Sequence, residues 1–115
     1  MKGAVVLVPV DRVERLTRRF GERFLRRAFT PGERADCEGR RNAAERLAAR
    51  LAAKAAARKA LPDRLLSFRS IAISTEAGGA PRISVPGVPA ARLFVSLSHD
   101  GGVAAAAVFI DPGSP

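Results

Sequence analysis

The sequence contains no tryptophan and no tyrosine, and its 115 residues include only six phenylalanines, one cysteine and one histidine. Proteins that bind single-stranded nucleic acid stack bases on aromatic side chains, so this composition argues against that class. The lone Cys37 excludes an intrachain disulfide and a cysteine metal cluster, and it is compatible with a cytoplasmic location. The apolar run at residues 4–10 is too short for a transmembrane span or a secretory signal, so we expect no membrane partner.

Acidic residues are few relative to basic ones. Lysine and arginine number 20 against 11 aspartates and glutamates, which gives a net charge of +9. Such a surface favours polyanions: nucleic acid, a phosphorylated cofactor or an acidic protein. Five arginines crowd one short segment, namely Arg18, Arg19, Arg23, Arg26 and Arg27. An acidic partner and simple solubility explain this cluster equally well.

A helix is predicted for Ala43–Leu61, because this stretch has no glycine, proline or β-branched residue. Alanine occupies much of its circumference, so neighbouring elements can approach its backbone closely. Three leucines share one face with three basic residues, namely Leu47, Leu51 and Leu61 with Arg50, Lys54 and Arg58. The basic row has two interpretations: side chains that snorkel from the core to water, or cations presented to a phosphorylated ligand.

The residues before this helix predict one strand and three short helices. The β-branched run Ala4–Val10 is typical of a strand, and Pro9 places it at an edge or a strand terminus. Asp11 follows as a candidate helix cap, and residues 30–33 (TPGE) have the pattern of a capping box. The predicted helices cover residues 12–17, 22–28 and 31–38.

Beyond the long helix the apolar pattern becomes strand-like. Residues 65–74 predict a strand in which Phe68, Ile71 and Ile73 supply the apolar side, with a hairpin return at residues 82–85. Further strands are predicted at 93–98 and 103–110, with a tight connection at residues 99–102. There is no internal repeat and no low-complexity linker. We therefore expect a single α+β domain over residues 1–115, with an antiparallel sheet packed on the long helix.

Three stretches have the order and separation of motifs in a known family. They read RFGERFLRRAFTP at residues 19–31, RLAAKAAARKAL at residues 50–61 and SLSHD at residues 96–100. Together they resemble the small, holo-acyl-carrier-protein synthase type of phosphopantetheinyl transferase, over nearly the whole chain. Members of that family use magnesium to move the phosphopantetheine arm from coenzyme A to a serine of an acyl carrier protein. The resemblance implies their α+β fold and a homotrimer with active sites between subunits.

Two positions depart from this family. The magnesium-binding aspartate of its first strand corresponds to Pro9, and the glutamate ligand of its long helix corresponds to Ala55. Magnesium is held by carboxylate oxygens, water and substrate phosphates, and neither residue offers it a side-chain oxygen. If the strand continued past Pro9, Asp11 would lie on the same face about 6.5 Å further along, which is far for an octahedral site. A one-residue gap in the alignment would restore the aspartate. Within the helix, Glu45 lies nearly three turns from Ala55.

Other residues of the family's site are kept. By resemblance, His99 and Lys59 are the candidate catalytic residues, and Arg50, Lys54, Lys59 and His99 are candidates for contact with coenzyme A or a pantetheine-linked ligand. His99 is expected in the hairpin turn, near the pyrophosphate. Arg19, Arg23 and Arg26 lie where the family docks the acidic helix of its carrier protein. No residue is assigned to a metal.

Three functions follow from these observations. The first is a family member that binds an acyl carrier protein or its cargo, has lost metal-dependent transfer and needs no cofactor. It could still perform metal-free acid–base chemistry with His99 in a biosynthetic pathway. The second is an active holo-acyl-carrier-protein synthase with rearranged magnesium ligands. The third, a basic nucleic-acid binder, ranks last because aromatic residues are few and no recognition motif is present.

Overall fold

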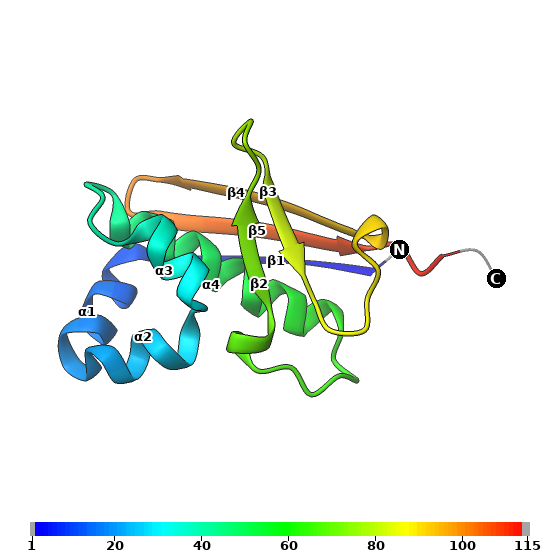
Figure 1. The fold of residues 1–115 in the computed structure, drawn as a ribbon, viewed down its shortest axis with the longest axis horizontal. Coiled ribbons are helices and arrows are strands. Elements are labelled where there is room, and N and C mark those ends of the chain that lie inside the picture. The colour runs from blue at the N-terminus through cyan, green and yellow to red at the C-terminus, as the bar shows by residue number, and fades with distance from the viewer. Residues whose placement is uncertain (1, 114–115) are drawn as a thin grey trace.

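The computed structural model describes residues 2–113, which form an α+β fold. The elements in chain order are β1 (Lys2–Pro9), α1 (Val10–Phe20), α2 (Glu22–Ala28), α3 (Pro31–Cys37), α4 (Ala43–Ala60), η1 (Phe68–Ser70), β2 (Ala72–Thr75), β3 (Pro81–Ser84), η2 (Ala90–Arg92), β4 (Leu93–Asp100) and β5 (Val103–Ile110). Helices α1, α2 and α3 gather at one end of the molecule, and the start of β1 and the end of β5 lie at the other end (Figure 1).

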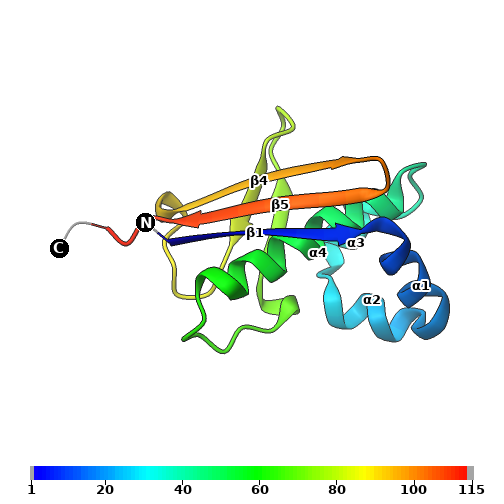
Figure 2. The ribbon, with the colours of Figure 1, turned by 180° about the vertical axis from the view of Figure 1, so that it is seen from behind.

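The main sheet has three antiparallel strands in the order β1-β5-β4, and the long helix α4 runs across one face of it (Figure 2). Successive side chains of a strand point to opposite faces. Val8, Ala104 and Val108 are therefore buried on the face towards α4, whereas Val5 and Leu7 lie on the open face. Strands β2 and β3 form a separate hairpin, whose tip projects from the body of the molecule (Figure 1).

Helix α4 is the centre of the core, as its composition predicts. Its alanines permit close approach of the sheet, and five of them have no exposed surface or almost none: Ala48, Ala52, Ala53, Ala56 and Ala57. The helix ends at Ala60, one residue before the predicted end, because Pro62 cannot continue it.

The predicted capping box at the start of α3 is confirmed. The Thr30 hydroxyl accepts from the Glu33 amide at 3.2 Å, and the Thr30 amide donates to the Glu33 carboxylate at 2.7 Å. Gly21 separates α1 from α2 with a φ of 54°, in the left-handed region that suits glycine. The two helical patterns expected before residue 28 therefore correspond to α1 and α2.

Three local predictions are corrected by the structure. Strand β1 ends at Pro9 and α1 begins at Val10, so Asp11 does not cap the helix but lies exposed in its first turn. Because the strand does not continue, Asp11 also does not share the face of Pro9. Phe68 lies in the 3₁₀ helix η1, not in a strand, because the Ser67 hydroxyl caps that turn by accepting from the Ser70 amide at 3.2 Å.

The connection between β4 and β5 is shorter than predicted. His99 and Asp100 belong to β4, where His99 is paired with Ala104. Only Gly101 and Gly102 form the turn, with φ angles of 58° and 81°. Two consecutive positive φ angles are typical of the tight hairpin turn that matches the twist of the strands. His99 is therefore fixed by a strand and is not part of a loop.

No helix among residues 2–113 is long and apolar enough to cross a membrane.

Candidate functional site

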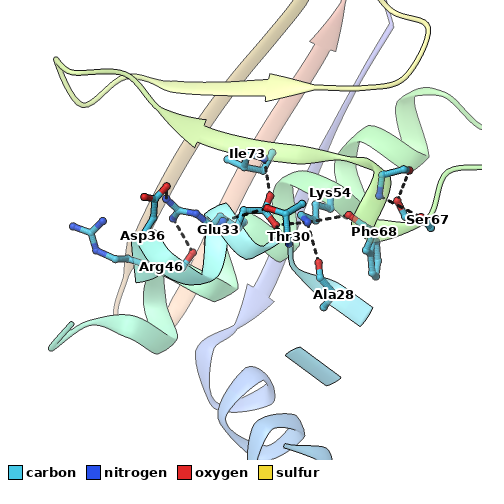
Figure 3. A network of polar contacts seen from close by, with 11 residues as sticks. Ala28, Thr30, Glu33, Asp36, Arg46, Lys54, Ser67, Phe68 and Ile73 are labelled. Carbon is cyan, nitrogen blue, oxygen red and sulfur yellow. Dashed lines mark hydrogen bonds and ion pairs between the residues drawn. The ribbon is translucent and has the colours of Figure 1, made fainter. Parts of the chain in front are cut away.

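The most buried polar group of the molecule is the ion pair between Lys54 and Glu33 (Figure 3). Both side chains have no exposed surface. The Lys54 ammonium donates to Glu33 at 2.5 Å and to the carbonyls of Ala28 and Phe68 at 2.9 Å each. A lysine ammonium has three donors, so all of them are used inside the protein.

This geometry corrects the expectation that Lys54 contacts a ligand. Burial lowers the pKa of Lys54 below its ordinary value, and the hydrogen bond and charge of Glu33 oppose that effect. Lys54 does not snorkel to water either, although it lies in the basic row of α4. The cause is Glu33, which the sequence presents only as part of a capping box. Lys54 therefore belongs to the core.

Arg50 is also buried, with an exposed fraction of 4%. Its guanidinium has fewer and longer hydrogen bonds than the Lys54 ammonium. It donates to the Arg46 carbonyl at 3.3 Å and to the Thr75 hydroxyl at 3.4 Å, and it lies 4.0 Å from the Asp36 carboxylate. Its Nε atom has no hydrogen-bond partner among residues 2–113. This Nε atom is itself buried, so Arg50, like Lys54, belongs to the core in this structure.

A cleft of about 970 Å³ lies between the second half of α4 and the segment that follows it. Three cations line this cleft, namely Arg58, Lys59 and Arg64, together with Ala55 and the residues from Leu65 to Phe68. The Arg58 guanidinium carbon lies 4.9 Å from the centroid of the Phe68 ring, a cation–π contact that orients its charge. The cleft combines positive charge with apolar surface, and it contains the predicted residue Lys59.

His99 does not line this cleft in a single chain. It is exposed near the end of β4, one residue before the last residue of the strand. That end of the sheet contacts the start of α1, because the Val10 amide donates to the Gly102 carbonyl at 2.8 Å. The structure therefore places His99 at the same end of the molecule as α1 and α2, and does not bring it to Lys59.

The predicted docking arginines are exposed on α1 and α2. Arg19 lies in the last turn of α1, and Arg23 and Arg26 lie on α2. A groove of about 300 Å³ runs between these helices; its lining includes Leu16, Phe20 and Phe24, with Arg23 and Arg27. This surface combines positive charge with an apolar floor.

The residues at the family's two metal positions do not fit a magnesium ion. Pro9 caps α1 without a side-chain hydrogen bond, and Ala55 lines the cleft with a methyl group. Neither side chain has an oxygen atom to act as a ligand. Among residues 2–113, no three His, Cys, Asp or Glu side chains are grouped as a metal site would require.

Sequence reasoning missed three features of these sites. Glu33 pairs with Lys54, Phe68 and Arg58 contact each other in the wall of the cleft, and Arg64 lines it as well. A lysine in an otherwise alanine-rich segment was the one local signal for a buried partner. Nothing in the local pattern indicates that Phe68 leaves the strand to face Arg58.

The chain matches known proteins over nearly its full length. The model of the 4'-phosphopantetheinyl transferase superfamily matches residues 7–108. A holo-[acyl-carrier-protein] synthase of Anaeromyxobacter dehalogenans is 42% identical over 105 residues, covering 82% of this chain and 80% of that protein. The corresponding synthase of Thermodesulfovibrio yellowstonii is 35% identical, over 92% of this chain and 94% of that protein.

Solved structures give the same result. The holo-[acyl-carrier-protein] synthase of Helicobacter pylori, in complex with coenzyme A, superposes with a TM-score of 0.84 at 30% identity, covering 95% of this chain and 99% of that one. The synthase of Neisseria meningitidis gives a TM-score of 0.83 at 28% identity, with 96% and 97% covered. The fold, the motifs and these matches together show that the chain belongs to the holo-acyl-carrier-protein synthase type of the 4'-phosphopantetheinyl transferase superfamily.

Proposed function

We propose that this protein transfers 4'-phosphopantetheine from coenzyme A to a serine of an acyl carrier protein. The cleft lined by Arg58, Lys59 and Arg64 carries this proposal, because it offers three cations and an apolar wall to a ligand with phosphates and an aliphatic arm. The relatives, which are named as synthases, support active transfer better than the loss of transfer favoured by the sequence alone.

Transfer forms a bond between the serine oxygen and the phosphorus that carries the pantetheine arm. It breaks the pyrophosphate bond of coenzyme A, and the adenosine bisphosphate part leaves. Negative charge then collects on phosphate oxygens, and fixed cations stabilise it. In this chain Lys59, Arg58 and Arg64 would supply that stabilisation from the cleft. His99, the only imidazole, is the proposed acceptor of the serine proton. Lys54 is not included, because its donors are used in the core.

A magnesium ion would normally add charge neutralisation at the phosphates. Since Pro9 and Ala55 supply no oxygen ligand, we assign no step of the reaction to a protein-bound ion. Loss of about 4 kcal/mol of stabilisation corresponds to about a thousandfold in rate. We therefore propose transfer that is slow and depends on the side-chain cations.

A second candidate is a protein that binds the carrier protein or its pantetheine-linked cargo without transfer. The absence of oxygen donors at Pro9 and Ala55 favours it. Both candidates use the same carrier-docking surface, made of Arg19, Arg23 and Arg26. They also share the cytoplasmic location that the lone Cys37 is compatible with.

We also propose that the protein assembles as a homotrimer, as its resemblance to the family implies. The open face of the main sheet supports an assembly, because five large apolar residues on or beside it are between 39% and 64% exposed: Val5, Leu7, Phe94, Val103 and Phe109. Apolar patches of this kind mark interaction surfaces more often than free surfaces. In a trimer, we expect an interface to bring His99 near the arginine-rich segment of a neighbour.

The test is the mass of an acyl carrier protein after incubation with coenzyme A and this protein. Transfer adds one phosphopantetheine group, and Lys59→Gln should slow its appearance at least tenfold. Arg82→Gln is the matched control, because Arg82 is an exposed cation on β3 that does not line the cleft. Binding of coenzyme A without any modification would favour the second candidate.

A further inference from the structure

The Lys54–Glu33 pair joins two parts of the molecule that the proposed function uses separately (Figure 3). One acceptor of the ammonium is the carbonyl of Ala28, the last residue of α2. Another is the carbonyl of Phe68, which begins η1 and lines the cleft. A single buried charge therefore connects the proposed carrier-docking helix to the wall of the proposed coenzyme A cleft.

Both connections are directional. The last carbonyls of a helix find no N–H donor within that helix. The Ala28 carbonyl therefore needs a donor from elsewhere in the protein. The Glu33 carboxylate fixes the ammonium from the opposite side, and it also accepts from the Ile73 amide at 2.6 Å. The ammonium is thus held by three oxygen atoms that come from three different segments.

An apolar side chain could fill the same space at lower cost. Removing two charges from water is expensive, and buried ion pairs are often no more stabilising than well-packed apolar residues. Filling the core therefore does not explain the pair. What the pair adds is a fixed geometry, because hydrogen bonds specify direction whereas apolar contacts do not.

The position of Phe68 matters for the cleft. Its ring lies 4.9 Å from the Arg58 guanidinium carbon, so a shift of the η1 backbone would move the surface on which Arg58 rests. On the other side, Arg26 of α2 and Arg69 of η1 line one groove of about 470 Å³. The docking helix and the cleft wall are therefore neighbours, and Lys54 lies at their junction.

We propose that Lys54, with Glu33 as its counter-ion, is a positioning residue that fixes the cleft wall at Phe68 relative to the docking helix α2. It contacts neither substrate, and its effect passes through the carbonyls of Ala28 and Phe68. As a consequence, coenzyme A in the cleft and the carrier protein on α2 are held at a fixed distance and orientation relative to each other. This inference rests on the proposed function of those two surfaces.

The test is the double variant Lys54→Met with Glu33→Gln, which leaves no unpaired buried charge. Glutamine keeps one acceptor oxygen, which can replace the carboxylate oxygen that binds the Thr30 amide or the one that binds the Ile73 amide, but not both. Hydrogen exchange of the backbone amides from Phe68 to Ile71 should become at least tenfold faster in the free protein. The dissociation constant for coenzyme A, measured by calorimetry, should rise at least tenfold.

Leu47→Ala is the matched control, because Leu47 is buried on the same helix but makes no hydrogen bond to the Lys54 ammonium. It should lower the melting temperature without a selective effect on residues 68–71. Equal changes in exchange and in coenzyme A affinity for the two variants would show that Lys54 acts only through stability, and would overturn the inference.

Two further outcomes are separable. If the native protein does not bind coenzyme A, the proposed function fails, while the exchange measurement still decides the role of Lys54. If the double variant does not fold, Lys54→Gln with Glu33→Gln replaces it, since an amide can still donate to one carbonyl. Partial loss of protection at residues 68–71 is then expected, and unchanged protection contradicts the inference.

Discussion

At the scale of single residues, the buried and the exposed cations of this protein have different roles. Lys54 and Arg50 lie in the core, whereas Arg58 and Lys59 reach the cleft from the same helix. The resemblance to the family placed Lys54 among the candidate ligand-binding residues. Its burial is decided by Glu33, which lies 21 positions earlier in the chain. A contact of that range is not encoded in the local pattern around either residue.

Arg34 provides a residue-scale prediction of pH dependence. It donates two hydrogen bonds to Glu22 at 2.7 and 2.8 Å, and these bonds lower the pKa of the Glu22 carboxyl below its ordinary value. A lowered carboxyl pKa stabilises the fold above about pH 4.5, and this stabilisation is lost as the pH falls through the folded-state pKa. Arg34→Gln should remove it.

Urea unfolding between pH 7 and pH 3 measures this effect. The difference in midpoint between the native chain and Arg34→Gln should shrink as the pH falls. Arg40→Gln is the control, because Arg40 is exposed and makes no side-chain ion pair within residues 2–113. A difference that stays constant over this range would show that the pair contributes no linked stability.

At the scale of elements, α4 packs through alanine, and this property was predictable. Ala52 and Ala56 have no exposed surface, so the sheet and its neighbours already touch their methyl groups. Ala52→Leu or Ala56→Leu should overpack the core and lower the free energy of unfolding by roughly 1–3 kcal/mol. Denaturant unfolding checks this, with Lys59→Leu as an exposed position on the same helix. Stability unchanged by both core substitutions would contradict the packing.

The helix pair α1–α2 carries the prediction for partner binding. Reversing Arg19, Arg23 or Arg26 to glutamate should weaken binding of an acyl carrier protein and slow association, because charges of opposite sign steer the encounter. The effect should diminish at high salt, since exposed charges are screened beyond about 8–10 Å. Arg82→Glu is the control on the projecting hairpin. If the affinity for the carrier protein changed neither on charge reversal nor with salt, this pair of helices would not be part of the interface.

The elements themselves were largely predictable, whereas several of their ends were not. Helix α4 and the capping box of α3 follow from strong local preferences. The start of α1 at Val10 was missed because Pro9 is a poor helix cap by residue type, although proline ends a strand naturally. The 3₁₀ turn at Phe68 was missed because Ser67 and Ser70 do not interrupt an alternating apolar pattern. The cleft beside it was therefore not predicted.

At the scale of the whole molecule, the open face of the main sheet predicts assembly. Leu7 is 64% exposed on the edge strand β1, opposite Ala105 of β5. Leu7→Lys should convert the proposed trimer to a monomer, because burying a lysine in an apolar interface is costly. Light scattering measures the mass, and Leu65→Lys is the control at an exposed leucine outside the sheet. A native protein that is monomeric at tens of micromolar would contradict the assembly.

Membership of the family was predictable from the three motifs. Whether this member catalyses the transfer was not predictable from them. The sequence identifies the missing carboxylates at Pro9 and Ala55, yet it does not show what replaces their effect. The structure adds the cleft in which Arg58 and Arg64 join Lys59. These three cations come from the helix and from the loop after it, so only the folded chain brings them together.

Restoring both carboxylates tests the central claim most directly. Pro9→Asp should be tolerated, because aspartate is a preferred N-cap residue and Pro9 already has the extended backbone of that position. Ala55→Glu would place a carboxylate in the cleft. The measurement is the initial rate at which an acyl carrier protein gains one phosphopantetheine group from coenzyme A, with and without magnesium.

The native chain should modify the carrier protein slowly, with a rate that changes little with magnesium. The double variant should be at least a hundredfold faster, and only when magnesium is present, because metal neutralisation at the phosphates contributes several kcal/mol. A native chain that gives no modified carrier protein, while the double variant gives it, would contradict transfer as the function and leave carrier binding in its place.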